Sequence, residues 1–218
     1  MRNEILSRIL TATILLPILF FAVVYSSFYL IALLIFVYFL CIYEIIKNTK
    51  NIFFNIFANV LLILSFLSFY YLRGNTDYSL IILLWILITT FLSDTGGYIF
   101  GKIFKGKKLT KISPNKTYSG LIGSIILSFL SLPLLNLSQY FFWNELLVEF
   151  LKFKFLIITF LISLVCQLGD LFVSLCKRKI KIKHISNILP GHGGVLDRID
   201  GLIFVLIFCS ILKSSLLI

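Results

Sequence analysis

The sequence predicts an all-α protein, a polytopic bundle of about seven transmembrane helices with a cytoplasmic N-terminus. Composition supports this fold class first, because 60% of the 218 residues are hydrophobic and only 13% are charged. Soluble domains are about half apolar and about a quarter charged, and the mean hydropathy of +1.05 lies far from that balance. We therefore expect the chain to lie in a lipid bilayer.

Seven apolar runs account for the predicted helices. A helix needs about 20 apolar residues to cross about 30 Å of hydrocarbon, and the sequence offers runs at 9–25, 28–46, 52–72, 78–100, 120–137, 155–176 and 199–218. Only Ser26 and Ser27 separate the first two runs. One helix over both would be about 57 Å long, nearly twice the thickness of the core, so we expect a tight helical hairpin there.

The basic residues predict the orientation. Lys and Arg near span ends are retained on the cytoplasmic side of a membrane. With the N-terminus inside, sixteen of the 20 Lys and Arg fall on cytoplasmic connections, and those outside are Arg73, Lys152, Lys154 and Lys213. The net charge of +11 would then attract anionic lipid headgroups on one surface. The same bias produces basic loops with no catalytic meaning, so charge alone does not define a site.

Five of the nine acidic residues gather at the predicted cytoplasmic ends of the spans. Asp94 and Asp170 lie at matching depths in the fourth and sixth runs, Asp197 and Asp200 open the seventh, and Glu44 lies at the end of the second. A carboxylate at membrane depth is costly unless it faces a polar cavity or binds a cation. Such residues are therefore functional candidates.

Their spacing suits a metal ion. Asp197 and Asp200 are three residues apart, which places both on one helical face, and Asp94 and Asp170 come from other helices at a similar level. Mg²⁺ prefers a few carboxylates and leaves positions for water and substrate phosphates, so these four aspartates are the candidate metal ligands. The alternative is internal ion pairing with Lys177, Arg178 or Arg198.

The loop after the fourth run carries groups suited to phosphate. It contains six lysines, and its Ser-Pro-Asn-Lys-Thr stretch predicts a helix start with Ser113, Lys116 and Thr117 near an anion. Glycines let the backbone approach a ligand closely. For Gly96 and Gly97 the alternative is close packing of membrane helices.

The loop after the sixth run has denser polar chemistry. Pro-Gly-His-Gly-Gly surrounds His192 with exposed amides, including those of Gly193 and Gly194, directly before the Asp197 and Asp200 pair. A pyrophosphate on those amides and on nearby basic side chains would be bridged to the carboxylates by Mg²⁺.

These motifs carry a family resemblance. Between residues 174 and 200, the chain has Ser, Lys-Arg, Lys and Pro-Gly-His-Gly-Gly-x-x-Asp-Arg-x-Asp, at the spacing of the bacterial phosphatidate cytidylyltransferase family, also called CDP-diacylglycerol synthases. The 93–120 loop resembles the family's Asp-Thr-x-x-Tyr, Gly-Lys and Ser-Pro-x-Lys-Thr elements. The resemblance divides the chain into N-terminal transmembrane helices, 1–92, and a catalytic region with two basic loops, 93–218. Three residues depart from the family pattern: Asn115, Val173 and His184.

The resemblance implies transfer of a cytidylyl group from CTP to phosphatidate, which gives CDP-diacylglycerol and pyrophosphate for phospholipid synthesis. It implies a multi-pass protein of the inner (plasma) membrane that uses Mg²⁺, CTP, phosphatidate and the lipid bilayer, and no nucleic acid; a homodimer is left open. The implied catalytic residues are Asp170, Lys177, Arg178, His192, Asp197, Arg198 and Asp200, although His192 suits a turn-stabilising role equally well. The implied substrate-binding residues are Ser113, Lys116, Thr117, Ser174, Lys183, Gly193 and Gly194.

Two other classes compete with this interpretation. A cation-coupled transporter also buries aspartates, but the halves of the chain show no convincing internal repeat and the acids sit near one edge. A CDP-alcohol phosphotransferase would carry an Asp-Gly-x-x-Ala-Arg start, which is missing here. A related cytidylyltransferase acting on another lipid phosphate stays open.

Overall fold

The computed structural model describes residues 13, 15, 17–25, 27–110, 113, 116–143, 147–180, 182, 185–186 and 193–215. Within these residues the regular structure is helical, apart from one isolated bridge between Lys108 and Thr117. The predicted all-α fold class is therefore confirmed.

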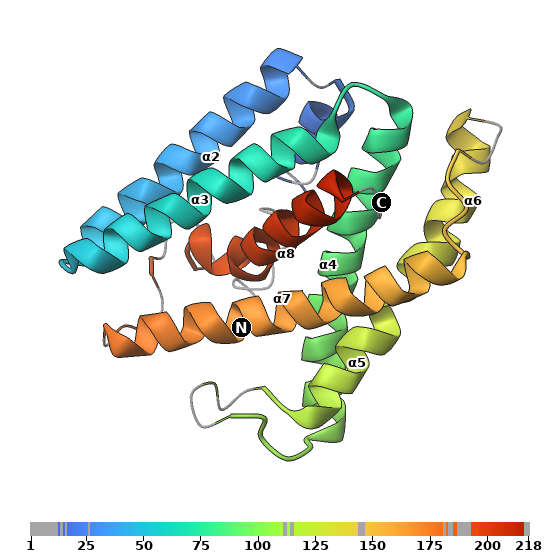
Figure 1. The fold of residues 1–218 in the computed structure, drawn as a ribbon. Coiled ribbons are helices and arrows are strands. Elements are labelled where there is room, and N and C mark those ends of the chain that lie inside the picture. The colour runs from blue at the N-terminus through green and yellow to red at the C-terminus, as the bar shows by residue number, and fades with distance from the viewer. Residues whose placement is uncertain are drawn as a thin grey trace.

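Seven helices follow a short helical segment over residues 17–25. They are α2 (Ser27–Asn48), α3 (Ile52–Arg73), α4 (Asp77–Phe104), α5 (Tyr118–Ser128), α6 (Ser131–Trp143), α7 (Phe153–Lys179) and α8 (Leu196–Ser214). In Figure 1, α2 and α3 run side by side, α8 lies between α3 and α7, and α4 crosses this layer with α5 against its lower half.

Five of the described helical segments are long and apolar enough to cross a membrane: Phe28–Asn48, Ile52–Arg73, Asp77–Phe104, Tyr118–Phe142 and Phe153–Lys179. They coincide with the second to sixth predicted runs, so the chain is a multi-pass membrane protein by helix length and composition. The first predicted run lies partly outside the described residues. The seventh corresponds to α8, whose first turns are more charged because α8 begins at Leu196, three residues before the predicted start.

The fifth predicted run, 120–137, is divided into α5 and α6. Pro133 has no N–H to donate to the carbonyl four residues earlier, and that carbonyl, on Phe129, accepts instead from the Leu132 N–H at 3.2 Å. The tighter turn separates the two helices, a break that the sequence prediction did not include.

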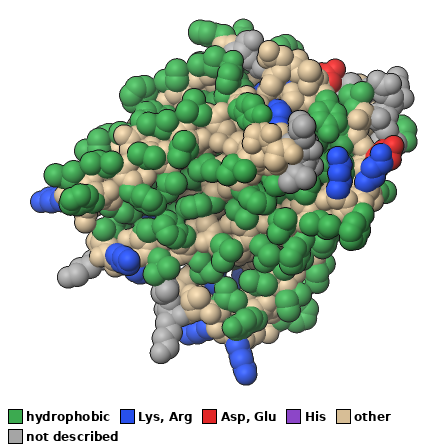
Figure 2. Space-filling view, viewed as in Figure 1, with side chains coloured by type: hydrophobic (Ala, Val, Ile, Leu, Met, Phe, Trp, Pro, Cys, Tyr) green, Lys and Arg blue, Asp and Glu red, His purple; other side chains and the backbone are tan. Residues whose placement is uncertain are grey.

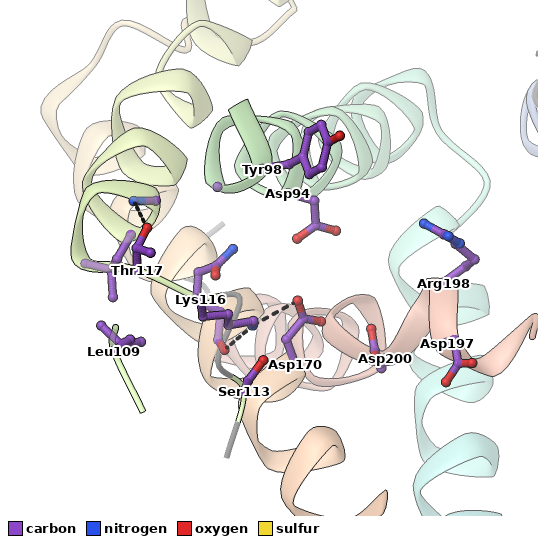
Figure 3. A pocket seen from close by; sticks show the side chains of 14 residues that line it. Asp94, Tyr98, Leu109, Ser113, Lys116, Thr117, Asp170, Asp197, Arg198 and Asp200 are labelled. Atoms are coloured by element: carbon purple, nitrogen blue, oxygen red, sulfur yellow. Dashed lines mark hydrogen bonds and ion pairs between the residues drawn. The ribbon is translucent and has the colours of Figure 1, made fainter. Parts of the chain in front are cut away.

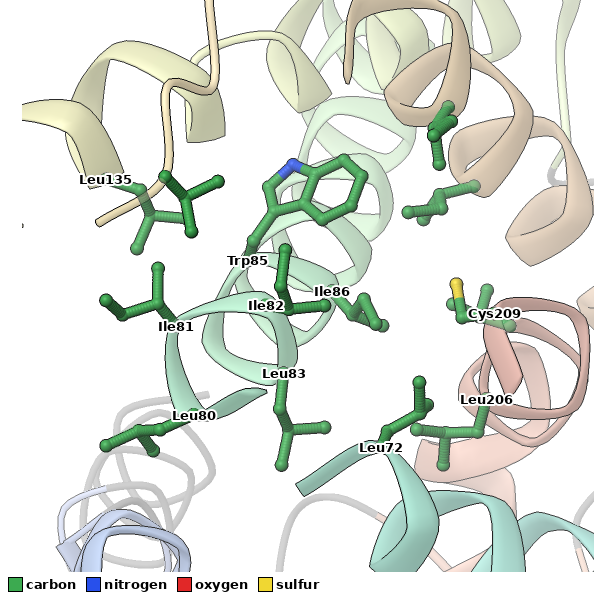
Figure 4. Close-up of a cluster of buried hydrophobic side chains, with 14 of the residues drawn as sticks. Leu72, Leu80, Ile81, Ile82, Leu83, Trp85, Ile86, Leu135, Leu206 and Cys209 are labelled. Atoms are coloured by element: carbon green, nitrogen blue, oxygen red, sulfur yellow. The ribbon is translucent and has the colours of Figure 1, made fainter. Parts of the chain in front are cut away.

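The larger apolar core is built around α4 (Figure 4). Trp85 is fully buried, and its ring lies 5.6 Å from that of Phe150 and 5.2 Å from that of Phe155. Leu206 and Cys209 of α8 belong to the same cluster. This core holds α4, α7 and α8 together and so fixes the elements that carry the predicted aspartates.

Small residues bring α4 and α5 into close contact. A methyl group on Gly96 would overlap the Gly123 carbonyl oxygen, and one on Gly120 would lie 2.8 Å from the Gly97 oxygen. Close approach of small residues is a common way for membrane helices to associate. The packing interpretation is therefore confirmed for Gly96.

The surface separates apolar and basic side chains. Figure 2 shows hydrophobic side chains over most of the visible face, with Lys and Arg side chains along its left and lower edges and others toward its right side. The end of α2, the end of α7 and the loop after α4 lie at these edges in Figure 1. The basic residues at the end of α2, at the end of α7 and in the loop after α4 therefore lie at the same end of the bundle. The side of the membrane that this end faces stays a prediction.

Candidate active site

A polar cavity of about 320 Å³ lies where α4, α5, α7 and α8 meet (Figure 3). Charged and hydroxyl side chains from segments far apart in the sequence line it. Those that the sequence analysis predicted are Asp94, Ser113, Lys116, Thr117, Asp170, Asp197, Arg198 and Asp200. The predicted metal ligands therefore share one cavity.

Asp94 of α4 and Asp170 of α7 face each other across this cavity (Figure 3). Asp94 Oδ1 accepts a hydrogen bond from the Cys166 thiol at 3.3 Å. A methyl group on Gly201 would lie 2.8 Å from both Asp170 Oδ1 and Cys166 Sγ. Because Gly201 has no side chain, α8 approaches α7 closely enough to place Asp200 beside Asp170.

Lys116 brings a positive charge to Asp170. Its ammonium lies 3.1 Å from Asp170 Oδ2 and 3.3 Å from the Gln167 carbonyl oxygen. A short hairpin positions it, since the Leu109 N–H donates to the Lys116 oxygen at 2.8 Å. Both side chains of the ion pair are about one-fifth exposed (21% each), so water reaches the pair and an anionic substrate has access to the ammonium.

Lys177 forms ion pairs with two carboxylates. Its ammonium lies 2.8 Å from Asp197 Oδ1 and 3.3 Å from Asp200 Oδ2, and its side chain is only 8% exposed. Asp197 Oδ2 also accepts the Ile185 N–H at 3.1 Å. Both Asp197 oxygens thus have protein partners, and in Figure 3 this carboxylate points away from Asp94. The ion-pair alternative therefore describes Asp197 and Lys177 well.

The cavity's donors have the chemistry that Mg²⁺ prefers, because carboxylate oxygens predominate. Among the residues that the structure describes, no three His, Cys, Asp or Glu are grouped closely enough to hold a metal ion as they stand. Lys116 pairs with Asp170, and Lys177 pairs with Asp197 and Asp200, so the protein itself supplies counter-charges to these carboxylates.

Other predicted residues lie outside the cavity lining. Arg178 is exposed and donates to the Ile182 oxygen at 3.4 Å. Ser174 is half-buried on α7. Lys183 and His192 fall outside the described residues.

Gly193 and Gly194, the glycines predicted to bind substrate, also lie outside the lining of the cavity. Gly193 has a φ of +87°, which favours glycine. A methyl group on Gly194 would lie 3.0 Å from Glu44 Oε2. The backbone at Gly194 is therefore packed against another helix.

Val173 lines a separate, apolar crevice between α3, α7 and α8, together with Phe57, Phe172 and Phe204. The apolar side chain of Val173, one of the departures from the family pattern, is thus surrounded by other apolar side chains. The departure at Val173 therefore matches its environment.

The sequence analysis missed several residues that line the cavity. Gln167 is a polar one, and Tyr98 is the tyrosine of the Asp-Thr-x-x-Tyr element, which the sequence analysis noted without assigning it to the site. Tyr98 lies four residues after Asp94 and Gln167 three before Asp170, spacings that place side chains on one face of a helix. Helical periodicity around each aspartate would have found both.

The fold and cavity define a class: a multi-pass helical protein with carboxylate, ammonium and guanidinium groups around one cavity. Comparison with known proteins narrows it, because residues 48–216 match the cytidylyltransferase family. The chain belongs to the cytidylyltransferase family.

Individual relatives with similar sequences carry a cytidylyltransferase name. The chain is 40% identical over 132 residues to a protein of Rickettsia conorii named phosphatidate cytidylyltransferase, covering 56% of this chain and 54% of the relative. A Staphylococcus saprophyticus protein of the same name is 40% identical over 149 residues, covering 67% and 54% respectively. For a Helicobacter pylori protein of that name, the match is 40% over 131 residues, covering 59% and 45%. The matches therefore span about half the length of these curated relatives.

Proposed function

We propose that the protein is a phosphatidate cytidylyltransferase, which transfers a cytidylyl group from CTP to phosphatidate. The observation that carries the proposal is the single cavity shared by Asp94, Asp170 and Asp200 with Lys116 and Arg198. It lies at the basic end of a membrane bundle, where a nucleotide from water and a lipid headgroup can meet. The names of the relatives point to the same reaction.

The proposed reaction is an in-line displacement. A phosphate oxygen of phosphatidate attacks the α-phosphorus of CTP, the bond from that phosphorus to the oxygen bridging to the β-phosphorus breaks, and pyrophosphate leaves with the electron pair. The attacking oxygen is already anionic, so no covalent enzyme intermediate is needed. Lys116 and Arg198 bind the phosphates and offset their charge, and the single positive charge of Lys177 offsets part of the negative charge of Asp197 and Asp200 in a mostly buried site.

Mg²⁺ is part of the proposal, with Asp94, Asp170, Asp197 and Asp200 as the residues that would hold it. When bound, a divalent ion supplies positive charge that stabilises the transferring phosphoryl group and the leaving pyrophosphate. The proposal also includes the remaining residues that the sequence predicted. The catalytic ones are Lys177, Arg178 and His192, and the substrate-binding ones are Ser174, Lys183, Gly193 and Gly194.

A finer topology accompanies this function. We propose seven spans, a cytoplasmic N-terminus, N-terminal transmembrane helices over 1–92 and a catalytic region over 93–218 in the inner membrane. The gathering of basic connections at one end of the bundle supports this orientation. Labelling of single cysteines introduced at Lys50 and Asn75 by an impermeant reagent in intact cells tests it, with labelling expected only at Asn75. A homodimer is left open, and the mass of the purified protein decides it.

Release of pyrophosphate from CTP by the purified protein tests the function. We expect release only when phosphatidate and Mg²⁺ are both present, together with CDP-diacylglycerol as the lipid product. Release without phosphatidate, or none at all, would overturn the proposal. Turnover with other lipid phosphates in place of phosphatidate would identify a related cytidylyltransferase instead. Cation uptake into proteoliposomes without CTP turnover would identify a transporter.

A further inference from the structure

Glu44 is a charged side chain buried at the same end of the bundle as the cavity, but it does not line the cavity. It lies near the end of α2 and is completely buried, at 0% exposure. It also precedes the part of the chain that matches the family, which starts at residue 48. A buried carboxylate is costly unless hydrogen bonds satisfy it, so its partners show what it does.

Three hydrogen bonds to the Glu44 carboxylate come from described residues of the segment that leads into α8. Oε1 accepts the Ser186 hydroxyl at 2.6 Å and the Val195 N–H at 2.8 Å, and Oε2 accepts the Leu196 N–H at 3.0 Å. Bonds from neutral donors to an ionised carboxylate are stronger than those between neutral groups. One side chain of α2 therefore fixes two separate parts of the loop.

Glu44 performs the role of a helix cap. The first N–H groups of a helix lack partners within it and attract negative charge, and Val195, the residue at the α8 N-cap position, has no side chain that can accept them. The carboxylate from α2 supplies the missing acceptor. Gly194 makes the approach possible, because a methyl group there would lie 3.0 Å from Glu44 Oε2 and 3.1 Å from Ser186 Oγ.

The cap adjoins the residues of the cavity. Leu196 precedes Asp197, and the first turn of α8 then presents Arg198 and Asp200 to the cavity. From the other side, Asp197 holds the Ile185 N–H at 3.1 Å, next to Ser186. The start of α8 is thus fixed between Glu44 on α2 and Lys177 on α7.

We infer that Glu44 is a positioning residue, which caps α8 and sets the rotation and depth at which Asp197, Arg198 and Asp200 enter the cavity. Its effect on turnover rests on the proposed function. Its effect on the start of α8 does not.

The test compares Glu44→Gln and Glu44→Asp with Glu149→Gln as the matched control. Gln keeps the shape but presents an NH₂ group to donors, whereas Asp keeps the charge on a shorter stem. Glu149 is an exposed carboxylate whose partner is Lys152 at 3.2 Å, far from the cap in sequence and contacts. Two measurements are made on the purified full chain: amide hydrogen exchange of peptides covering 193–203, and the Mg²⁺ concentration that gives half-maximal turnover.

For Glu44→Gln we expect at least about tenfold faster exchange at the start of α8, unchanged exchange in α4, and about a tenfold higher half-maximal Mg²⁺ concentration. Glu44→Asp should show smaller changes in the exchange rate and in the half-maximal Mg²⁺ concentration. Glu149→Gln should give the parental value in both measurements. A merely structural role would lower the fraction of active molecules without changing the Mg²⁺ dependence. Parental exchange and parental Mg²⁺ dependence in Glu44→Gln would overturn the inference. If the parent protein itself fails to turn over CTP, the proposed function fails, while the exchange measurement still decides whether Glu44 caps α8.

Discussion

Both ends of the helix bundle bury charged side chains, but the two ends use them differently. At one end, which we call the Arg73 end, Arg73 is buried and donates to the carbonyl oxygens of Val23, Val24 and Gly74. Lys213 donates to the Tyr71 and Leu72 oxygens, each at 3.0 Å. These cations satisfy carbonyl groups where helices end, a position that favours positive charge.

At the other end, which we call the Asp170 end, carboxylates from three helices surround a cavity with lysines as their counter-charges. The comparison teaches that burial of a charge does not by itself identify a functional residue. The partners of Arg73 and Lys213 are backbone oxygens at helix ends, which indicates a structural role. The carboxylates and lysines of the Asp170 end share a cavity instead, which is typical of a ligand site.

Asp200→Asn should have the largest effect and tests the Asp170 end. Loss of one negative charge from the cavity should lower kcat/KM for CTP by about 100- to 1000-fold, the range seen when one stabilising group is removed from a site. Asp77→Asn is the control, because Asp77 is exposed at the start of α4 near the Arg73 end. Turnover by Asp200→Asn at the level of the control would remove Asp200 from the site.

Arg73→Met tests the Arg73 end. The substitution leaves carbonyl oxygens without their buried donor, so the free energy of unfolding in detergent should fall by about 2 kcal/mol. Turnover per folded molecule should stay at the parental value. A selective loss of turnover with unchanged thermal stability would show that the two ends do not differ as described.

Lys116→Met and Lys213→Met form a matched pair across the two ends. Lys116→Met removes the charge beside Asp170, and we expect kcat/KM for CTP to fall about tenfold, equivalent to about 1.4 kcal/mol. Lys213→Met should lower only thermal stability, because its partners are the backbone oxygens of α3. Steady-state kinetics and thermal melting of both variants make the comparison, and equal kinetic losses would contradict it.

Gly96→Ala should have the smallest effect of the four, a loss of about 1 kcal/mol in stability from overpacking. Gly97→Ala is its matched partner one residue away, because a methyl group there meets Gln167 Nε2 only at 3.5 Å. Its stability should equal that of the parent or exceed it by up to about 1 kcal/mol, because Ala is a better helix former than Gly. Thermal melting in detergent measures both. Equal melting temperatures of the two variants would contradict the claim that the close contact between α4 and α5 requires glycine at position 96.

Much of this fold was predictable because long apolar runs have few structural alternatives. The run at 52–72 became α3, Ile52–Arg73, and the run at 155–176 became α7, Phe153–Lys179. The break between α5 and α6 had its signal in Pro133, but proline is tolerated in many membrane helices. Its effect depended on local hydrogen bonding that the sequence does not specify.

The candidate site was predictable by chemistry and less so by orientation. Asp94, Asp170, Asp197 and Asp200 stood out because carboxylates are rare in apolar runs, and all four line the cavity. Ion pairing with Lys177 was an alternative that the sequence analysis left open, but sequence spacing does not say which carboxylate a lysine contacts. The hydrogen bond from the Ile185 N–H to Asp197 was not predicted. The partners of Glu44 lie 142 to 152 residues away along the chain, and only the packed fold brings them together.

Binding of Mn²⁺, a paramagnetic substitute for Mg²⁺, to the purified protein in detergent tests the central claim most directly. Electron paramagnetic resonance can count bound ions without any turnover. The account predicts that Mn²⁺ binds to the parent and to Arg73→Met with equal affinity, and at least about tenfold more weakly to Asp200→Asn. Equal binding by the parent and Asp200→Asn, or no binding by either, would contradict the claim that the Asp170 end is built to hold a divalent ion.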